Sequence, residues 1–307
     1  MQRNNKELKK SKLTVSVVVT NYNGRELLEQ NLPNVIKAKN NPGNNIIEII
    51  VVDDFSTDDS LIYLNSLKSE ISIIKHTKNR GFSATSNTGV RSSKGDLVVL
   101  LNSDASPKEN FLQNTLELFD DEKLFGVTFH EKGIGFAKGG FKDGYIEQIT
   151  GNETNKITPS FYISGGSSIV RKTIWKELGG FDEKLLSPFY WEDIDLSFRA
   201  VKKGYICLWD PRAEVVHNHM STISKLSKRK VDTIRERNQL LVHWKNIHSK
   251  NMFRKHIFEM FKRAFKHPGY FKIILLASLK IFDVLRLRKK EIKESIVSDE
   301  AIFSRFK

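Results

Sequence analysis

The chain has 307 residues, of which 39% are hydrophobic and 10% aromatic, and this ordinary globular composition excludes a protein that is disordered throughout. Its one cysteine, Cys207, excludes an intramolecular disulfide and a metal site built from several thiolates, and it fits a reducing cytosol. We expect no membrane-spanning helix, which would need about 18 consecutive apolar residues. We expect no signal peptide either, because the apolar run at residues 15–19 is too short.

The net charge of +14 belongs entirely to the last part of the chain. Residues 1–224 contain 28 Lys and Arg against 28 Asp and Glu, whereas residues 225–307 contain 22 against 8. This division predicts a flexible basic arm at 1–12, a main domain at 13–224 and a basic helical region at 225–307. The basic region should face an anionic partner, such as lipid head groups, a phosphorylated substrate or nucleic acid.

Strand-like and helix-like segments alternate in the first part of the chain. Runs of aliphatic and β-branched residues predict strands at 15–20, 46–52, 71–76 and 97–101. Helices are predicted at 25–38, within 79–89 and at 107–119, where Ser106 and Glu109 have capping-box spacing. This alternation predicts an α/β fold with a mostly parallel, doubly wound sheet flanked by helices.

The pattern is looser past residue 129. We expect a hairpin or loop, a strand, two helices and two short strand-like pieces, at 133–151, 161–170, 173–178, 191–203, 206–209 and 214–217. Beyond residue 225 the chain is predicted to be helical. The segment 271–287 has a strong apolar face, which is typical of an amphipathic helix lying in the plane of a membrane; the alternative is a helix that docks onto the main domain.

Acidic residues stand where predicted strands end or a helix begins. Asp53 and Asp54 follow one strand and Asp104 another, so the two clusters can converge at the carboxyl edge of a parallel sheet. Carboxylates there can accept hydrogen bonds from a ribose, and Asp104 can hold Mg²⁺ or Mn²⁺ on a diphosphate. Glu192 and Asp193 could face the other side of a substrate, with one of them as general base. The alternatives are helix capping for Asp53 and Asp54, a turn role for Asp104, and a solvated helix face for Glu192 and Asp193.

Six motifs occur in a characteristic order and spacing: VSVVVTNYNG at 15–24, VVDDFSTDDS at 51–60, NRGFSATSNTG at 79–89, LLNSDA at 100–105, GGSSIVRKTIWKELGGFDE at 165–183 and WEDIDLSFRAVKKGY at 191–205. Together they make about residues 13–220 resemble glycosyltransferase family 2. The chain looks closest to the rhamnosyltransferase-like branch of bacterial polysaccharide and cell-wall synthesis. The resemblance implies a GT-A fold and inverting transfer from a nucleotide-diphosphate sugar to a hydroxyl of a saccharide or lipid-linked acceptor.

The resemblance also implies the roles of individual residues. Asp193 would be the catalytic base, and Asp104 would bind the divalent metal (Mg²⁺ or Mn²⁺), with His217, or alternatively His219, completing its shell. Asn102 stands where the family's metal-binding motif has its first Asp, which weakens a bidentate arrangement. The nucleotide or substrate would contact Thr20, Tyr22, Asp53, Asp54, Arg80, Gly81, Asn87, Asn102, Ser103, Trp191 and Glu192. For Trp191, core packing is the alternative to stacking on an acceptor sugar.

Several other functions remain as alternatives. Because of Asn102, a catalytically inactive, membrane-associated glycosyltransferase-like scaffold is the main rival, and a nucleotidyltransferase is a weaker one. A nicotinamide dehydrogenase is disfavoured because no G-x-G-x-x-G follows the first strand. Nucleic acid is not expected as a partner, since the basic charge lies outside the motif-bearing part of the chain. We expect a cytoplasmic enzyme held on the inner face of the cell membrane, an anionic surface, by its basic helices.

Overall fold

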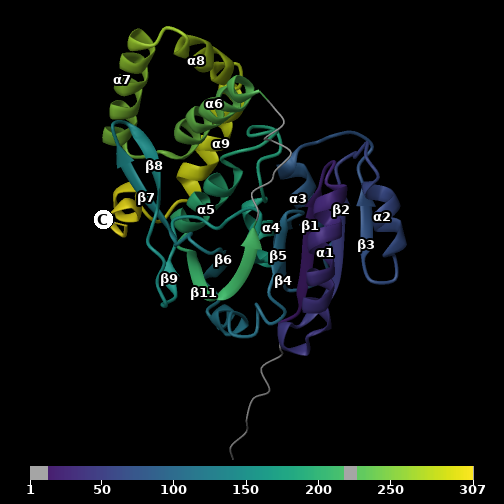
Figure 1. Ribbon diagram of the computed structural model, residues 1–307. Helices are drawn as coiled ribbons and strands as arrows, with labels where there is room; N and C mark the ends of the chain where they lie inside the picture. The colour runs from purple at the N-terminus through teal and green to yellow at the C-terminus, as the bar shows by residue number, and fades with distance from the viewer. Residues whose placement is uncertain (1–12, 218–226, 307) are drawn as a thin grey trace, which may run out of the picture.

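The computed structural model describes residues 13–217 and 227–306, and in these ranges one mixed sheet of nine strands forms the centre of the molecule (Figure 1). Its strand order is β3 (Ser72–Lys75), β2 (Ile46–Asp53), β1 (Val15–Asn21), β4 (Leu97–Asn102), β10 (Ser167–Arg171), β6 (Leu124–His130), β11 (Ile206–His217) and β5 (Ala105–Pro107), with β9 (Thr158–Pro159) beside β11. The four strands from β3 to β4 are parallel, and β10 runs antiparallel to both of its neighbours. The predicted α/β fold with flanking helices is confirmed.

The parallel strands are buried on both faces because helices cover each side. Along β1, Val17 and Val19 pack with α1 (Arg25–Asn40) and α2 (Ser60–Ser66), whereas Val18 packs on the side of α3 (Phe82–Ser92). This explains why the strand is a continuous run of valines rather than an alternation of polar and apolar residues. The register pairs Asn21 with Asp53 and Thr20 with Asn102, so the polar ends of three strands meet at one edge.

The prediction of a helix at 107–119 is wrong. Residues Ala105–Pro107 form β5, which pairs antiparallel with the end of β11, and turns lead from it to a short 3₁₀ helix, η2 (Leu116–Asp120). The Ser106 hydroxyl accepts a hydrogen bond from Asn34 Nδ2 (2.8 Å) instead of capping a helix. The sheet edge offered by β11 therefore overrides the local capping signal.

The later elements largely follow the sequence pattern. The glycine-rich stretch is a hairpin of β7 (Ala137–Lys142) and β8 (Tyr145–Thr150), and the two predicted helices are α4 (Lys172–Leu178) and α5 (Glu192–Lys202). The two strand-like pieces at 206–209 and 214–217 are one long strand, β11, whose register shifts between Asp210 and Glu214. The sequence predicts a strand at 161–170, and the strand that pairs in the sheet is the shorter β10, Ser167–Arg171.

The C-terminal region consists of five helices in its described part. They are α6 (Lys228–Asn246), α7 (Lys250–Lys266), α8 (Tyr270–Ser278), α9 (Ile281–Glu294) and α10 (Asp299–Ser304). The single helix expected at 271–287 is thus two helices that meet at Leu279 and Lys280. In the described ranges no helix is both long and apolar enough to cross a bilayer.

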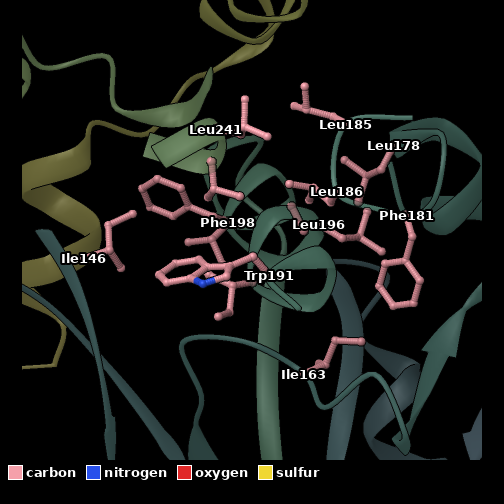
Figure 2. Close-up of a cluster of buried hydrophobic side chains, with 14 of the residues drawn as sticks. Ile146, Ile163, Leu178, Phe181, Leu185, Leu186, Trp191, Leu196, Phe198 and Leu241 are labelled. Carbon is pink, nitrogen blue, oxygen red and sulfur yellow. The ribbon is translucent and has the colours of Figure 1, made fainter. Parts of the chain in front are cut away.

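Helix α6 is built into the core of the main domain. Leu240, Leu241 and Val242 are fully buried in the same apolar cluster as Leu196 and Phe198 of α5, and Figure 2 shows Leu241 beside this group. The change in charge near residue 224 therefore does not coincide with a break in the hydrophobic core. The division into an arm at 1–12, a main domain at 13–224 and a basic region at 225–307 remains a prediction. The arm lies outside the described residues.

A buried ionic network also joins α5 to α6. The Asp195 carboxylate is fully buried and lies 2.7 Å from Lys245 Nζ and 3.0 Å from Arg199 Nε. Asn246 Nδ2 donates a further hydrogen bond to it (2.7 Å). Burial alone would raise the pKa of Asp195, but the two cations and this amide hold it below its ordinary value.

We predict that Asp195→Asn lowers the free energy of unfolding by about 3–5 kcal/mol, because it removes the nearest carboxylate of the buried Lys245 and the ion-pair partner of the buried Arg199. Urea unfolding of the full chain measures this. Asp283→Asn is the matched control, since the Asp283–Arg286 pair is exposed and its loss should cost less than about 1 kcal/mol. Equal effects of the two substitutions would contradict a structural role of this network.

Candidate active site

The ends of β1 and β2 form the first part of the candidate site. Asp53 is fully buried, and its carboxylate accepts hydrogen bonds from Asn21 Nδ2 (2.9 Å) and from the Ser56 N–H (3.0 Å). Thr20 Oγ1 lies 3.4 Å from Asn102 Oδ1, whereas Tyr22 is exposed at the same edge. The sequence did not single out Asn21, although its place directly after a buried strand, next to Asp53, was the available signal.

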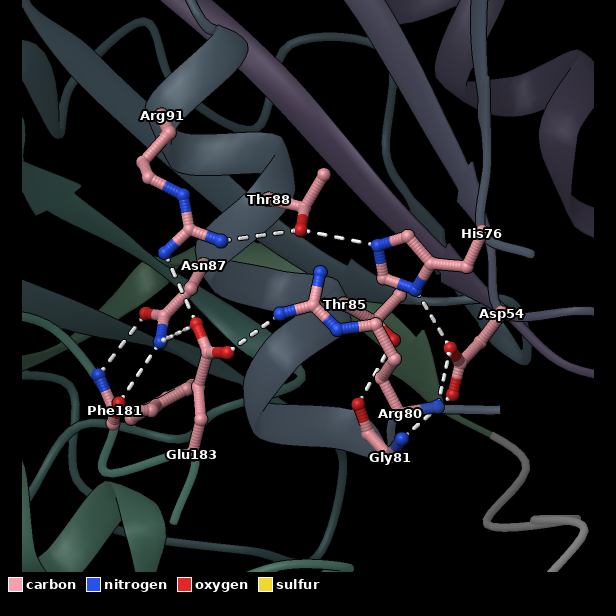
Figure 3. Close-up of polar contacts among 10 residues, drawn as sticks. All are labelled: Asp54, His76, Arg80, Gly81, Thr85, Asn87, Thr88, Arg91, Phe181 and Glu183. Carbon is pink, nitrogen blue, oxygen red and sulfur yellow. Dashed lines mark hydrogen bonds and ion pairs between the residues drawn. The ribbon is translucent and has the colours of Figure 1, made fainter. Parts of the chain in front are cut away.

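Asp54 holds the loop that precedes α3, as Figure 3 shows. Its two carboxylate oxygens accept hydrogen bonds from the N–H groups of Arg80 (2.9 Å) and Gly81 (2.8 Å), and His76 Nδ1 lies 2.7 Å away. Gly81 has a φ of +82°, and a Cβ atom there would lie 2.8 Å from the carbonyl oxygen of Pro188. Asp54 therefore fixes the backbone of the loop before α3, and it does not cap α2, whose N-cap is Asp59.

Arg80 and Asn87 contact the loop after α4. Arg80 Nη2 lies 2.8 Å from Glu183 Oε2, and Arg91 Nη1 lies 3.0 Å from Glu183 Oε1 (Figure 3). Asn87 is buried and exchanges two hydrogen bonds with the backbone of Phe181, at 2.8 and 3.0 Å. Burial opposes the charge on Glu183, but the hydrogen bonds from Asn87 and Arg91 keep the pKa of Glu183 below its ordinary value. These contacts hold α3, and the loop before it, against the loop that follows α4.

Asp104 and His217 come together because β5 pairs with the end of β11, which places His217 opposite Ala105. His217 Nε2 lies 3.0 Å from Asp104 Oδ1, and His217 Nδ1 lies 2.9 Å from Glu131 Oε1. Burial favours the neutral ring, but the hydrogen bonds that the protonated ring donates to both carboxylates outweigh this effect and raise the pKa of His217 to about 9. Glu131, at the end of β6, was missed by the sequence analysis because it stands in no recognised motif. His219 lies outside the described residues.

The donor chemistry of this pair suits a hard divalent cation. One carboxylate oxygen and one imidazole nitrogen face each other, and such ligands bind Mg²⁺ or Mn²⁺ when oxygen atoms of a substrate supply the remainder. No group of three or more His, Cys, Asp or Glu side chains is poised as a metal site within the described chain. A metal would therefore need the diphosphate of a nucleotide as a further ligand, and it would displace the proton from His217.

Asn102 and Ser103 lie between these two parts of the site. The Asn102 N–H donates to the carbonyl of Gly166 (2.9 Å), and a Cβ atom on Gly166 would clash with the Asn102 side chain. Glycine is therefore required where the backbone approaches the Asn102 side chain this closely. The Ser103 carbonyl accepts a hydrogen bond from Asn31 Nδ2 (3.1 Å), which ties the turn before Asp104 to α1.

Asp193 and Glu192 open α5, and both have raised pKa values. Burial raises the pKa of Asp193 to about 6, against the opposing effect of the N–H groups of Ile194 and Gly165. Burial and the neighbouring Asp193 charge raise the pKa of Glu192 well above its ordinary value. At neutral pH, Asp193 is thus mostly ionised, whereas burial and the Asp193 charge both disfavour the ionised form of Glu192. Because Glu192 is buried, the alternative of a solvated helix face is wrong for Glu192, whereas Asp193 is half-buried.

The loop before Asp193 is held by α6. Tyr190 and Trp191 both have a positive φ, 73° and 75°, which is rare for aromatic residues and persists only where the surroundings enforce it. Asn238 Nδ2, fully buried, lies 2.6–3.0 Å from the carbonyl oxygens of Leu186, Phe189 and Tyr190. Trp191 itself packs in the apolar core (Figure 2). Its ring also makes an edge-to-face contact with His243. This burial favours the core-packing alternative for Trp191 over stacking on a sugar.

Comparison with known proteins agrees with this geometry. A pre-mycofactocin glycosyltransferase of Mycobacterium tuberculosis is 26% identical over 197 residues, which cover 60% of this chain and 40% of that protein. An N-acetylglucosaminyl-diphospho-decaprenol L-rhamnosyltransferase of the same organism is 38% identical over 60 residues, 20% of this chain and 19% of that protein. The chain therefore spans less than half the length of these relatives.

A solved structure and a family model complete the comparison. GalNAc-T7 with UDP, GalNAc and Mn²⁺ superimposes with a TM-score of 0.62 and 18% identity, over 76% of this chain and 48% of that chain. This likeness shows the GT-A fold. The family model described as glycosyl transferase family 2 matches residues 16–179, which is more than half of the chain. With its fold, its sheet-edge carboxylates and this match in agreement, the chain belongs to glycosyl transferase family 2.

Proposed function

We propose that this protein is an inverting glycosyltransferase that moves a sugar from a nucleotide-diphosphate sugar to a hydroxyl of a saccharide or lipid-linked acceptor, assisted by Mg²⁺ or Mn²⁺. The observation that carries the proposal is the raised pKa of Asp193, about 6, at the start of α5. An ionised carboxylate of that basicity is suited to act as a general base near neutral pH. The M. tuberculosis rhamnosyltransferase and the Mn²⁺ complex of GalNAc-T7 support the assignment to polysaccharide or cell-wall synthesis and to a metal-assisted reaction.

The residues divide the chemistry between two sides of the site. The oxygen of the acceptor hydroxyl attacks the anomeric carbon from the face opposite the leaving diphosphate, which inverts that centre. Asp193 takes the proton of this hydroxyl during the attack. Asp104 and His217 would hold the metal, which when bound neutralises negative charge on the diphosphate. Asp53, oriented by Asn21, would accept hydrogen bonds from the nucleotide, with Thr20 and Tyr22 beside it.

Further assignments complete the proposal. Arg80, Gly81 and Asn87 would shape the nucleotide pocket through the contacts that hold its walls, and Asn102 and Ser103 would place Asp104. The enzyme would be cytoplasmic and peripheral on the inner face of the cell membrane. The inactive scaffold remains the second candidate because Asn102 leaves Asp104 as the one carboxylate in the tripeptide Asn102–Ser103–Asp104.

The direct test is a donor screen. The purified chain is mixed with several nucleotide-sugars and Mn²⁺, Mg²⁺ or EDTA, and release of nucleoside diphosphate is measured. We expect release from one donor that EDTA abolishes and Mn²⁺ or Mg²⁺ restores, because a metal held by Asp104 and His217 would neutralise the charge on the leaving diphosphate. No release of nucleoside diphosphate from any donor, together with no nucleotide binding, would favour the inactive scaffold.

The base assignment predicts a specific pH dependence. Transfer should fall below pH about 6, and at pH 5 it should be about tenfold slower than its plateau, because Asp193 must be ionised to accept a proton. Asp193→Asn should lower kcat by at least about a thousandfold while leaving nucleotide affinity within about twofold, as expected for a group that acts in the transition state. Asp143→Asn, at the exposed turn of the β7–β8 hairpin, is the control and should change neither. Retained transfer in Asp193→Asn would refute the assignment.

Asn238 is predicted to be a positioning residue for Asp193. Asn238→Ala removes the donor that holds the loop carbonyls before Asp193, so kcat should fall by about ten- to a hundredfold, as misplacement of a reacting group does. If the loop relaxes and Asp193 becomes more solvated, the acid limb of the pH profile should also move below pH 6. Kinetics at several pH values test this, with Asn251→Ala on the exposed side of α7 as control. A loss of stability with an unmoved acid limb would reduce Asn238 to a structural role.

A further inference from the structure

Large apolar side chains are exposed along the helices that follow α6. Of the 18 such side chains that the structure describes as exposed, nine lie between residues 250 and 294. On α7, Phe258, Phe261 and Phe265 recur at spacings of three and four residues and therefore share one face of the helix. They are 67%, 44% and 75% exposed. An unpartnered face of this kind is typical of a docking surface.

Exposed apolar side chains continue along the chain from α7 onto α8 and α9. The rings of Phe265 and Phe271 make an edge-to-face contact with centroids 5.6 Å apart, so the two helices meet in one aromatic corner. Figure 1 shows α7 and α8 at the top of the molecule, beyond α6 and away from the central sheet. We call the whole set the apolar face: Phe258, Phe261, Phe265, Phe271, Leu275, Leu279, Phe282 and Leu285. Phe282 is the most exposed of them, at 85%.

Positive charge surrounds the apolar face. Residues 250–294 contain 13 Lys and Arg against 4 Asp and Glu. Lys266 and Lys272 flank the aromatic corner, are exposed, and make no ion pair within the described chain. An open groove of about 700 Å³ borders the same corner, and Lys228, Arg229, Arg263 and His267 are among its lining residues. A surface that is both apolar and cationic is complementary to anionic lipid head groups above an acyl layer.

We propose that the apolar face docks on an anionic lipid bilayer, with the aromatic corner inserted at the level of the head groups and the surrounding lysines on lipid phosphates. A second copy of this chain fits less well, because two such faces would bring like charges together. The proposal identifies the surface and the partner behind the peripheral location given under Proposed function, and it rests on that function for its biological meaning. Its physical basis is independent of the active site.

Vesicle flotation of the full chain tests the proposal. We expect binding to vesicles of phosphatidylcholine with phosphatidylglycerol, and little binding to phosphatidylcholine alone. Raising NaCl from about 0.1 M to about 1 M should weaken the binding, since the Debye length falls from about 10 Å to about 3 Å. The triple substitution Phe265→Ser, Phe271→Ser, Phe282→Ser should lower the partition coefficient at least about tenfold, because each substitution removes an apolar ring that would insert into the bilayer.

Matched controls come from the same chain. Ile47→Ser, Ile62→Ser and Ile296→Ser remove three exposed apolar side chains elsewhere, 48%, 71% and 78% exposed, and should leave binding unchanged. Lys266→Glu with Lys272→Glu should weaken binding about as much as the aromatic triple variant, whereas Lys68→Glu with Lys94→Glu, on other exposed segments, should not. Equal binding by the aromatic triple variant and the wild type, or no binding by the wild type, would overturn the proposal.

Two further measurements separate this proposal from its rivals. Light scattering gives the oligomeric state, and a wild-type dimer that the aromatic triple variant converts to a monomer, without vesicle binding, would show an interface between copies instead. Release of nucleoside diphosphate from the donor in solution should be the same in wild type and triple variant, because the three rings are exposed and have no assigned part in the active site. Vesicle binding without donor turnover would thus contradict the proposed function and leave the docking surface standing.

Discussion

The parallel register of β1, β2 and β4 is the constraint on which the candidate site depends. Side chains that are more than 30 residues apart in sequence, such as Asn21 and Asp53, hydrogen-bond because their strands end at the same edge. Each strand is buried on both faces, so a shift of register by one residue would move every side chain to the opposite face and separate these polar ends. The precision of the site is therefore provided by the apolar core beneath it.

The C-terminal region is the second support of the site, although its composition differs from that of the rest of the chain. The leucines of helix α6 pack in the core, and its Lys245 forms an ion pair with Asp195. The Asn238 amide of the same helix donates hydrogen bonds to the loop before Asp193. The positive φ values of Tyr190 and Trp191 are maintained by these contacts. The proposed base thus depends on residues about 50 positions away in sequence.

The environment, rather than the residue type, distinguishes the carboxylates of this protein. Asp53 and Asp54 are buried but accept hydrogen bonds from backbone and side-chain donors, which compensate for lost water. Asp195 is compensated by two cations and has a lowered pKa, whereas Asp193 and Glu192 lack such partners and have raised pKa values. Three carboxylates within four residues of α5 therefore serve different purposes: Asp195 supports the fold, and Asp193 and Glu192 are suited to proton chemistry.

The sequence by itself determined the family, the α/β fold and the strands that carry the site, because buried parallel strands are continuous apolar runs and the motifs at their ends are local. It also located the charge in residues 225–307. Only the tertiary structure decided that 105–107 form a strand, that Trp191 is a core residue, and that Glu131, Asn21 and Asn238 contact the residues and the loop of the candidate site. Each of these depends on a pairing between distant segments, such as β5 with β11 or α6 with the loop at 186–190. Local patterns cannot specify such contacts, because they form only when the whole core closes.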